Sequence, residues 1–105
     1  MHPTYGLHGK LTAMPGHADQ LARILQQAAQ LMAVVAGCHL YLVSKDATTP
    51  NAVWVTEIWD SKADHDASLS LPGVRELIGQ ALPLLDGQPS RGQELEILGG
   101  HGIPQ

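Results

Sequence analysis

The residues that most constrain the fold are 52 to 60, AVWVTEIWD, because they are apolar on both sides of a predicted β-strand. Side chains along a strand alternate between its two faces. One face would carry Val53, Val55, Glu57 and Trp59, and the other would carry Trp54, Thr56 and Ile58. Neither set is purely polar, so both faces should be covered by other parts of the protein. We therefore expect this segment to be a central strand.

The chain before this strand combines strand and helix patterns. Residues 5 to 13 alternate in polarity as a strand does. From 17 to 35, apolar residues recur at helical spacing; they are Leu21, Ile24, Leu25, Ala28, Leu31, Met32 and Val35. Gly37 suits the end of this helix because glycine tolerates left-handed dihedral angles. Residues 38 to 45, CHLYLVSK, predict a second strand.

The chain after the central strand predicts two helices. Ser61 and Asp64 resemble a capping box, in which a hydroxyl and a carboxylate each accept a bond from an unpaired backbone N–H. A short helix should begin there. Pro72 suits the first turn of a second helix, whose apolar stripe runs from 74 to 85. Pro83 lies inside that stripe and predicts a kink or an early end.

The order of these elements, with a fourth strand at 90 to 98, fits an α+β ferredoxin-like sandwich: strand, helix, strand, strand, helix pair, strand. The 105 residues suffice for a single domain, with a core from about 5 to 98 and a flexible tail at 99 to 105. Helices can cover only one face of such a sheet. Because the other face is also apolar, we predict a homodimer packed face to face.

Charge and composition argue against several functional classes. The formal net charge is −4, and the six Lys and Arg residues are not clustered, so no nucleic-acid partner is expected. No run of about 18 apolar residues predicts a membrane span, and the first residues lack a signal-peptide pattern. Cys38 is the single cysteine, so no intrachain disulfide can form. We expect a cytoplasmic protein with no membrane partner.

Motifs of the common cofactor sites are missing from the sequence. The six histidines, at positions 2, 8, 17, 39, 65 and 101, include no pair at metal-ligand spacing. We find no phosphate-binding loop, dinucleotide-binding glycine motif or serine nucleophile elbow. Cys38 precedes His39, but neighbouring strand residues face opposite sides, so we expect a buried, unreactive thiol. No metal and no cofactor are predicted.

Three segments, GKLTAMPG (9–16), GCHLYLV (37–43) and TEIWDSKADHDASLSLPGV (56–74), together resemble the antibiotic biosynthesis monooxygenase family, including its quinol-oxidising branch. Each segment is weakly specific alone, but their order and spacing are fairly specific and span nearly everything from 5 to 98. The resemblance implies a dimeric α/β barrel with a pocket between sheet and helices in each subunit. It also implies oxidation of a polycyclic or quinol-type aromatic by molecular oxygen, without metal or flavin.

Such an oxidation needs few protein groups. Triplet oxygen reacts slowly with closed-shell molecules, but a deprotonated hydroxyarene can reduce it, so the protein must mainly supply a base and a dry pocket. Many relatives carry a histidine nine residues beyond the tryptophan; that position here is Ser68, and His65 lies three residues earlier. Positions near the haem-binding residues of the haem-degrading branch are His8 or Gly9, Ser68 and about Ile78, so haem is not expected.

Three histidines are candidates for contact with the substrate. His65 and His8 are the candidate bases, because imidazole side chains exchange protons near neutral pH. His39, on the second strand, is a candidate for the pocket wall. The alternative for His65 is exposure to solvent near a helix start, and the alternative for the two strand histidines is a structural place at the rim of the sheet.

Glu57 is the third candidate for the catalytic group. A carboxylate on a central strand needs a partner or a raised pKa, because its burial is otherwise costly. The alternative, which we favour for this residue, is a structural ion pair or hydrogen bond. Its partner would then be Arg75, Arg91 or Lys10.

The remaining candidates would shape a slot for a flat substrate: Trp59, Tyr41, Ser68, Leu69 and Leu82. Trp54 is a further candidate for an aromatic wall, although such residues more often belong to a core or a dimer interface. Two other functions stay open on this fold. One is a non-catalytic module that binds a small aromatic, and the other is a cofactor-free isomerase or decarboxylase that uses the same base without oxygen.

Overall fold

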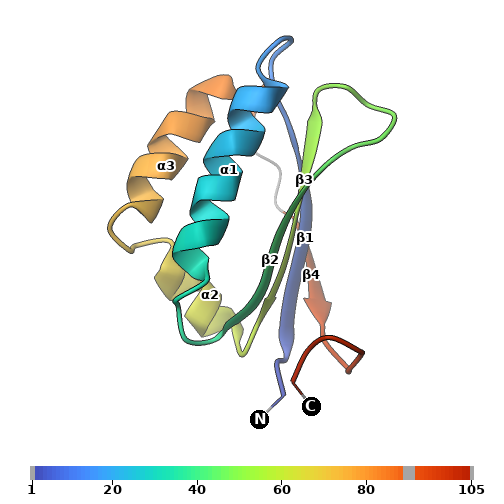
Figure 1. The fold of residues 1–105 in the computed structure, drawn as a ribbon, viewed down its shortest axis with the longest axis vertical. Helices are drawn as coiled ribbons and strands as arrows, with labels where there is room; N and C mark the ends of the chain where they lie inside the picture. Colours follow the sequence, from blue (N-terminus) through green and yellow to red (C-terminus); the bar gives the residue numbers. More distant parts are fainter. Residues whose placement is uncertain (1, 89–91, 105) are drawn as a thin grey trace.

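A computed structural model describes residues 2–88 and 92–104, which form a four-stranded sheet and three α-helices (Figure 1). The elements are β1 (Tyr5–Thr12), α1 (Ala18–Met32), β2 (Cys38–Lys45), β3 (Ala52–Trp59), α2 (Lys62–Ser68), α3 (Val74–Ala81), the short 3-10 helix η1 (Leu82–Leu84) and β4 (Gln93–Glu96). Their order confirms the predicted ferredoxin-like α+β fold. None of the helices in the described ranges has the length and apolar character needed to cross a bilayer.

The sheet has the strand order β2-β3-β1-β4, and every neighbouring pair is antiparallel. β3 is therefore central, as its two apolar faces predict. The register places Glu57 of β3 between Leu7 of β1 and Tyr41 of β2. Residues opposite each other in a ladder share a face, so these three side chains project to the same side.

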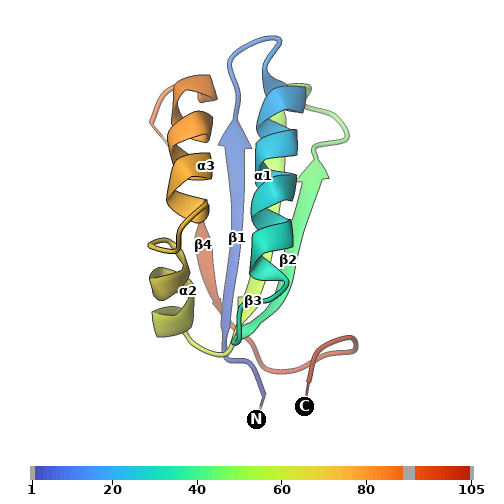
Figure 2. The ribbon, with the colours of Figure 1, turned by 60° about the vertical axis from the view of Figure 1, so that its left-hand side comes forward.

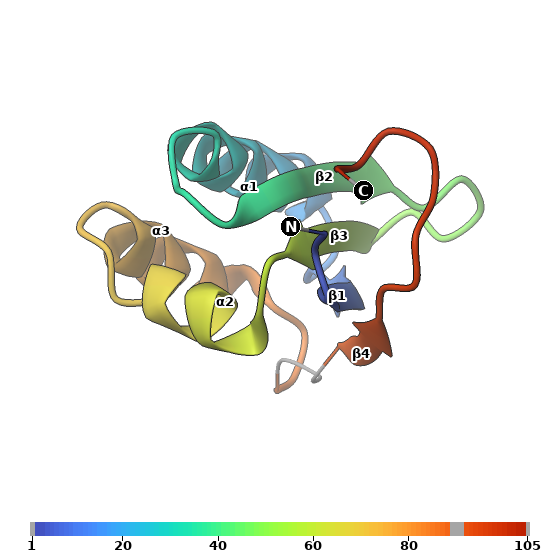
Figure 3. The same cartoon turned by 90° about the horizontal axis from the view of Figure 1, so that it is seen from below.

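The helices all cover one face of the sheet, which we call the inner face; the opposite side is the outer face (Figures 2 and 3). On the inner face, β3 buries Val53, Val55, Glu57 and Trp59. The buried apolar stripe of α1 packs against this face. The outer face carries apolar side chains too, and Leu42 and Leu95 there are 49% and 45% exposed.

The helix α1 is shorter than predicted. It ends at Met32 rather than at about Val35, and its C-cap is Ala33 rather than Gly37. Its predicted last turn contains two β-branched residues, and Val34 is 88% exposed, so continuing the helix would bury nothing at that position. Gly37 instead takes a positive φ of 94° at the entry to β2, where an added Cβ would lie 2.9 Å from a carboxylate oxygen of Asp64.

The second half of the chain confirms some predicted boundaries and corrects others. The Ser61 hydroxyl accepts the backbone N–H of Asp64 at 3.2 Å, as an N-cap should. Pro72 does not occupy the first turn of α3, because that helix begins after Gly73. The φ of Gly73 is +87°, which is not a helical value. The α-helix ends before Pro83, as predicted. β4 is shorter than the predicted 90 to 98, of which 90 and 91 lie outside the described residues.

Candidate functional site

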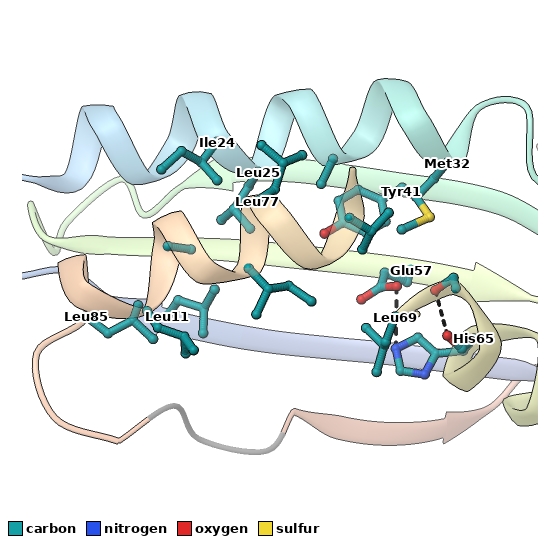
Figure 4. A pocket seen from close by; sticks show the side chains of 16 residues that line it. Leu11, Ile24, Leu25, Met32, Tyr41, Glu57, His65, Leu69, Leu77 and Leu85 are labelled. Atoms are coloured by element: carbon teal, nitrogen blue, oxygen red, sulfur yellow. Dashed lines mark hydrogen bonds and ion pairs between the residues drawn. The ribbon is translucent and has the colours of Figure 1, made fainter. Parts of the chain in front are cut away.

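A cavity lies between the inner face and the three helices, with a volume of about 730 Å³ that includes open space at its mouth (Figure 4). Most of its lining is aliphatic, as in typical small-molecule sites. Six of the nine predicted site residues line it; they are Tyr41, Glu57, His65, Ser68, Leu69 and Leu82. The folded chain therefore brings residues from β2, β3, α2 and η1 to one cavity.

Glu57 is the buried carboxylate of this cavity, with only 8% of its surface exposed. Burial raises its pKa. The indole N–H of Trp59, which donates to Oε1 at 3.0 Å, offsets part of that rise, as does the positive charge of His65 when its ring is protonated. Its hydrogen-bond donor is thus a tryptophan rather than Arg75, one of the three expected partners. Of the other two, Lys10 lies over the Trp54 ring, 5.8 Å from its centroid, and Arg91 lies outside the described residues. Trp59 is fully buried and does not line the cavity, so it positions the carboxylate from behind.

His65 lies beside this carboxylate. Its Nε2 is 3.8 Å from Oε1 of Glu57, and its Nδ1 is 2.9 Å from Oδ1 of Asp66. The bond to His65 lowers the pKa of Asp66, so Asp66 is an ionised acceptor and Nδ1 carries the proton. In the neutral ring, Nε2 then presents its lone pair to the cavity and to Glu57 (Figure 4). Only 12% of the side chain is exposed, so the alternative of a solvent-exposed histidine is wrong.

The position of His65 follows from local structure. α2 begins directly after β3, and the Ser61 cap sets the first turn, so His65 lies above the end of β3. Its ring packs near Tyr5 and, edge-on at 83°, near Trp59, with centroid distances of 5.6 and 5.8 Å. Ser68, which is 2% exposed, donates its hydroxyl to the backbone carbonyl of His65 at 2.6 Å. The serine thus bonds within α2, to the backbone of the residue that carries the imidazole.

Tyr41 supplies a hydroxyl to the same cavity from β2. Burial, followed by the charge of Glu57, raises its pKa well above the ordinary value of 10.0, so the phenol stays protonated. No hydrogen bond to this hydroxyl comes from residues 2–88 or 92–104. A protonated donor therefore lines the cavity, on the strand position paired with Glu57.

Two predicted histidines lie outside the cavity. His8 belongs to the outer face, where its Nδ1 is 2.9 Å from the Thr56 hydroxyl and its ring stacks on Trp54 at 4.7 Å. His39 is the extra residue of a β-bulge between Cys38 and Leu40, and its Nε2 is 2.6 Å from Oδ1 of Asp60. The bulge interrupts the alternation of faces on which the sequence argument relied.

The bulge also affects the environment of Cys38. The thiol is half-buried rather than fully buried, and it donates to the carbonyl of Leu40 at 3.7 Å. Burial raises its pKa, so the thiolate is disfavoured. No cluster of three or more potential metal ligands among His, Cys, Asp and Glu occurs in the part of the chain that the structure describes.

One functional residue was missed by sequence reasoning. Asp66 fixes the proton on Nδ1 of His65, and its only signal in the sequence is its place directly after that histidine. Neighbours on a helix usually project in different directions, so the pattern His-Asp alone does not predict contact. The exposed position of the carboxylate lets it turn back to the ring.

The chain matches known proteins over most of its length. The family model "Antibiotic biosynthesis monooxygenase" matches residues 4–80. A Chloroflexus aurantiacus protein, provisionally described as an antibiotic biosynthesis monooxygenase, is 42% identical, with a TM-score of 0.85 and coverage of 96% of this chain and 99% of that chain. A Deinococcus radiodurans protein with the same provisional description is 31% identical, with a TM-score of 0.72 and coverage of 96% and 97%.

Other comparisons are less specific. A Nitrosomonas europaea protein has a TM-score of 0.85 at 10% identity, over 93% of both chains, and therefore supports the fold alone. No curated protein matches the chain. The range that the family model matches includes Glu57, Trp59 and α2, and the two more similar structures share the overall fold. The chain belongs to the antibiotic biosynthesis monooxygenase family.

Proposed function

We propose that the protein is a cofactor-independent monooxygenase that oxidises a hydroxylated aromatic or quinol with molecular oxygen. The observation that supports this most is the arrangement of His65: Nδ1 is held by Asp66, and Nε2 faces a largely apolar cavity beside Glu57. A neutral imidazole in this state is a general base. The substrate hydroxyl would lie within reach of Nε2 and transfer its proton there.

Glu57 would stabilise the imidazolium that this transfer creates. A carboxylate about 4 Å from a unit positive charge contributes roughly 4 kcal/mol at an effective dielectric constant of ~20. The hydroxyl of Tyr41 would donate to the oxygen anion of the deprotonated substrate. Aliphatic walls would exclude water from the electron-rich anion, which then transfers electrons to oxygen.

The overall reaction balances without an external reductant. In a monohydroxylated ring, one oxygen atom replaces a ring hydrogen and becomes a carbonyl oxygen. The original hydroxyl loses its hydrogen and becomes the second carbonyl, so a quinone forms. The second oxygen atom leaves as water with the two hydrogens removed, and the substrate supplies all four electrons.

The test is oxygen uptake by the purified protein with a panel of phenols, naphthols and hydroquinones, followed by product analysis with isotopically labelled dioxygen. We expect one labelled atom in the product and one in water. Absence of uptake above the buffer rate with every compound would refute the oxygenase. Product formation without oxygen would instead indicate the isomerase or decarboxylase, and binding without any product would indicate the non-catalytic module.

The functional unit would be a homodimer packed through the outer face. The supporting observation is that this face has apolar side chains and no helix over it among the described residues, with Leu42 and Leu95 about half exposed. Leu42→Asp should yield a monomer in light scattering after size exclusion. Val34→Asp, at an 88% exposed position in the turn after α1, is the matched control and should not change the mass. A monomeric wild type would refute the dimer.

A further inference from the structure

The polar groups of the cavity are concentrated at one end. Glu57, His65 and Ser68 are linked there by the contacts described above, and Tyr41 lies opposite Glu57 in the β2–β3 ladder. The other twelve lining residues, out of sixteen, are all aliphatic or methionine. A ligand that fills this space can therefore satisfy hydrogen bonds only at one of its ends.

The aliphatic end extends well beyond the reach of a single ring. Leu11 lines it, and Leu11 is four residues along β1 from Leu7, the residue paired with Glu57. Four residues of a strand span about 13 Å. Figure 4 shows Leu11 and Leu85 at the opposite end of the cavity from Glu57 and His65, with Leu77 between them.

The mouth of the cavity is apolar as well. Leu69, Ile78 and Leu82 all line the cavity, and they are 44%, 37% and 49% exposed. Ile78 and Leu82 are four residues apart, so they lie on one side of the α3–η1 segment. Neighbouring apolar side chains with this much exposure are typical of a surface that a ligand covers.

We infer that the ligand is an amphiphile: a hydroxylated aromatic head at Glu57 and His65, carrying an apolar tail that runs along α3 toward Leu85. The aromatic head of this ligand rests on the proposed function. The tail is assigned by the polarity of the cavity alone. A compact ring with hydroxyl groups on all sides is the ligand that this cavity excludes, because its distal hydroxyls would be buried without partners.

The test measures binding, so that it does not depend on turnover. A series of 4-n-alkylphenols, from methyl to hexyl, is titrated into the wild-type protein without oxygen, with calorimetry as the readout. We expect the dissociation constant to fall about fourfold for each added methylene, as burial of that group predicts. A dissociation constant that does not depend on tail length would overturn the inference.

Two matched variants locate the tail. Ala81→Phe adds bulk to the α3 wall of the cavity, whereas Gln80→Phe adds the same ring at an exposed position that does not line it. The dependence on tail length should flatten in Ala81→Phe and persist in Gln80→Phe. A full dependence in a folded Ala81→Phe variant would contradict the path along α3. If the wild-type dependence holds but no phenol or hydroquinone is oxidised, the amphiphile inference stands and the oxygenase proposal fails.

Discussion

A cluster of a carboxylate, a tryptophan and a histidine lies at each face of the sheet, and the two clusters have different properties. The inner cluster is Glu57, Trp59 and His65, and the outer cluster is Asp46, Trp54 and His8. In each cluster the tryptophan N–H donates to the carboxylate, at 3.0 Å in the inner and 2.8 Å in the outer one. In each, the histidine ring lies near the indole, with centroids 5.8 and 4.7 Å apart. Composition and pairing alone therefore do not tell the two clusters apart.

Burial and backbone hydrogen bonds separate them. The inner carboxyl has its pKa raised by burial, whereas the indole of Trp54 and the backbone N–H groups of Thr48 and Thr49 hold the pKa of Asp46 far below its ordinary value. The imidazole of His8 is occupied by Thr56 and stacked on the indole, while Nε2 of His65 faces the cavity. Environment, more than residue type, therefore distinguishes a candidate catalytic cluster from a structural one.

The largest expected difference between the clusters is in turnover. His65→Ala should lower kcat by roughly 10²- to 10⁴-fold, because it removes the general base, while His8→Ala should have a far smaller effect. The measurement is the rate of oxygen uptake with the best substrate found in the panel. Partial rescue of His65→Ala by added imidazole would support the base role. Equal losses in both variants would remove the distinction between the clusters.

The tryptophans should differ next, in their contribution to stability. Trp59→Phe leaves a buried carboxyl without its donor and should lower the free energy of unfolding by about 2–3 kcal/mol. Trp54→Phe removes the same bond from a carboxylate that water can reach, so the loss should be smaller. Denaturant unfolding at one fixed protein concentration measures both. A larger loss of unfolding free energy in Trp54→Phe than in Trp59→Phe would contradict the conclusion that Glu57 is the more buried of the two carboxyl groups.

A smaller effect is expected from loss of the N-cap of α2, the helix that carries His65 of the inner cluster. Ser61→Ala removes the N-cap of α2 and should lower the free energy of unfolding by about 1 kcal/mol. The same change should reduce kcat, because the first turn of α2 positions His65. Ser70→Ala, an exposed residue just after α2, is the control and should change neither. If turnover is unaltered in Ser61→Ala, the N-cap of α2 does not position His65.

The smallest effects should appear in the pH dependence of stability. The folded protein holds the Glu57 proton above the ordinary pKa of 4.5, so stability should fall as the pH rises from 4.5 through the folded pKa. Glu57→Gln should abolish this decline. Asp46 behaves oppositely: it contributes stability above 3.8 that is lost as the pH falls through its folded pKa, and Asp46→Asn should abolish that loss. Unfolding curves across pH that move in the same direction for both variants would contradict the comparison.

Much of the inner face was predictable from the spacing of residues. The alternation in residues 52 to 60 places Glu57 and Trp59 on one face, and both are buried there. The N-cap at Ser61 and the end of α3 before Pro83 follow from backbone hydrogen bonding, which depends on few neighbours. The length of α1 could not be predicted in this way, because the residues around Val34 do not show that it has no surface to pack against.

The order of strands and helices, and the residues of β3 that share a face, could be read from the chain alone, because both depend on periodicity along it. Which histidine enters the cavity depends on long-range packing. The ladder between β1 and β3 places His8 beside Thr56 on the outer face, a bulge turns His39 toward Asp60, and the start of α2 places His65 against Glu57. The contacts of His8 and His39 join residues that are 48 and 21 positions apart in the sequence. Pairing at that distance depends on the register of the whole sheet.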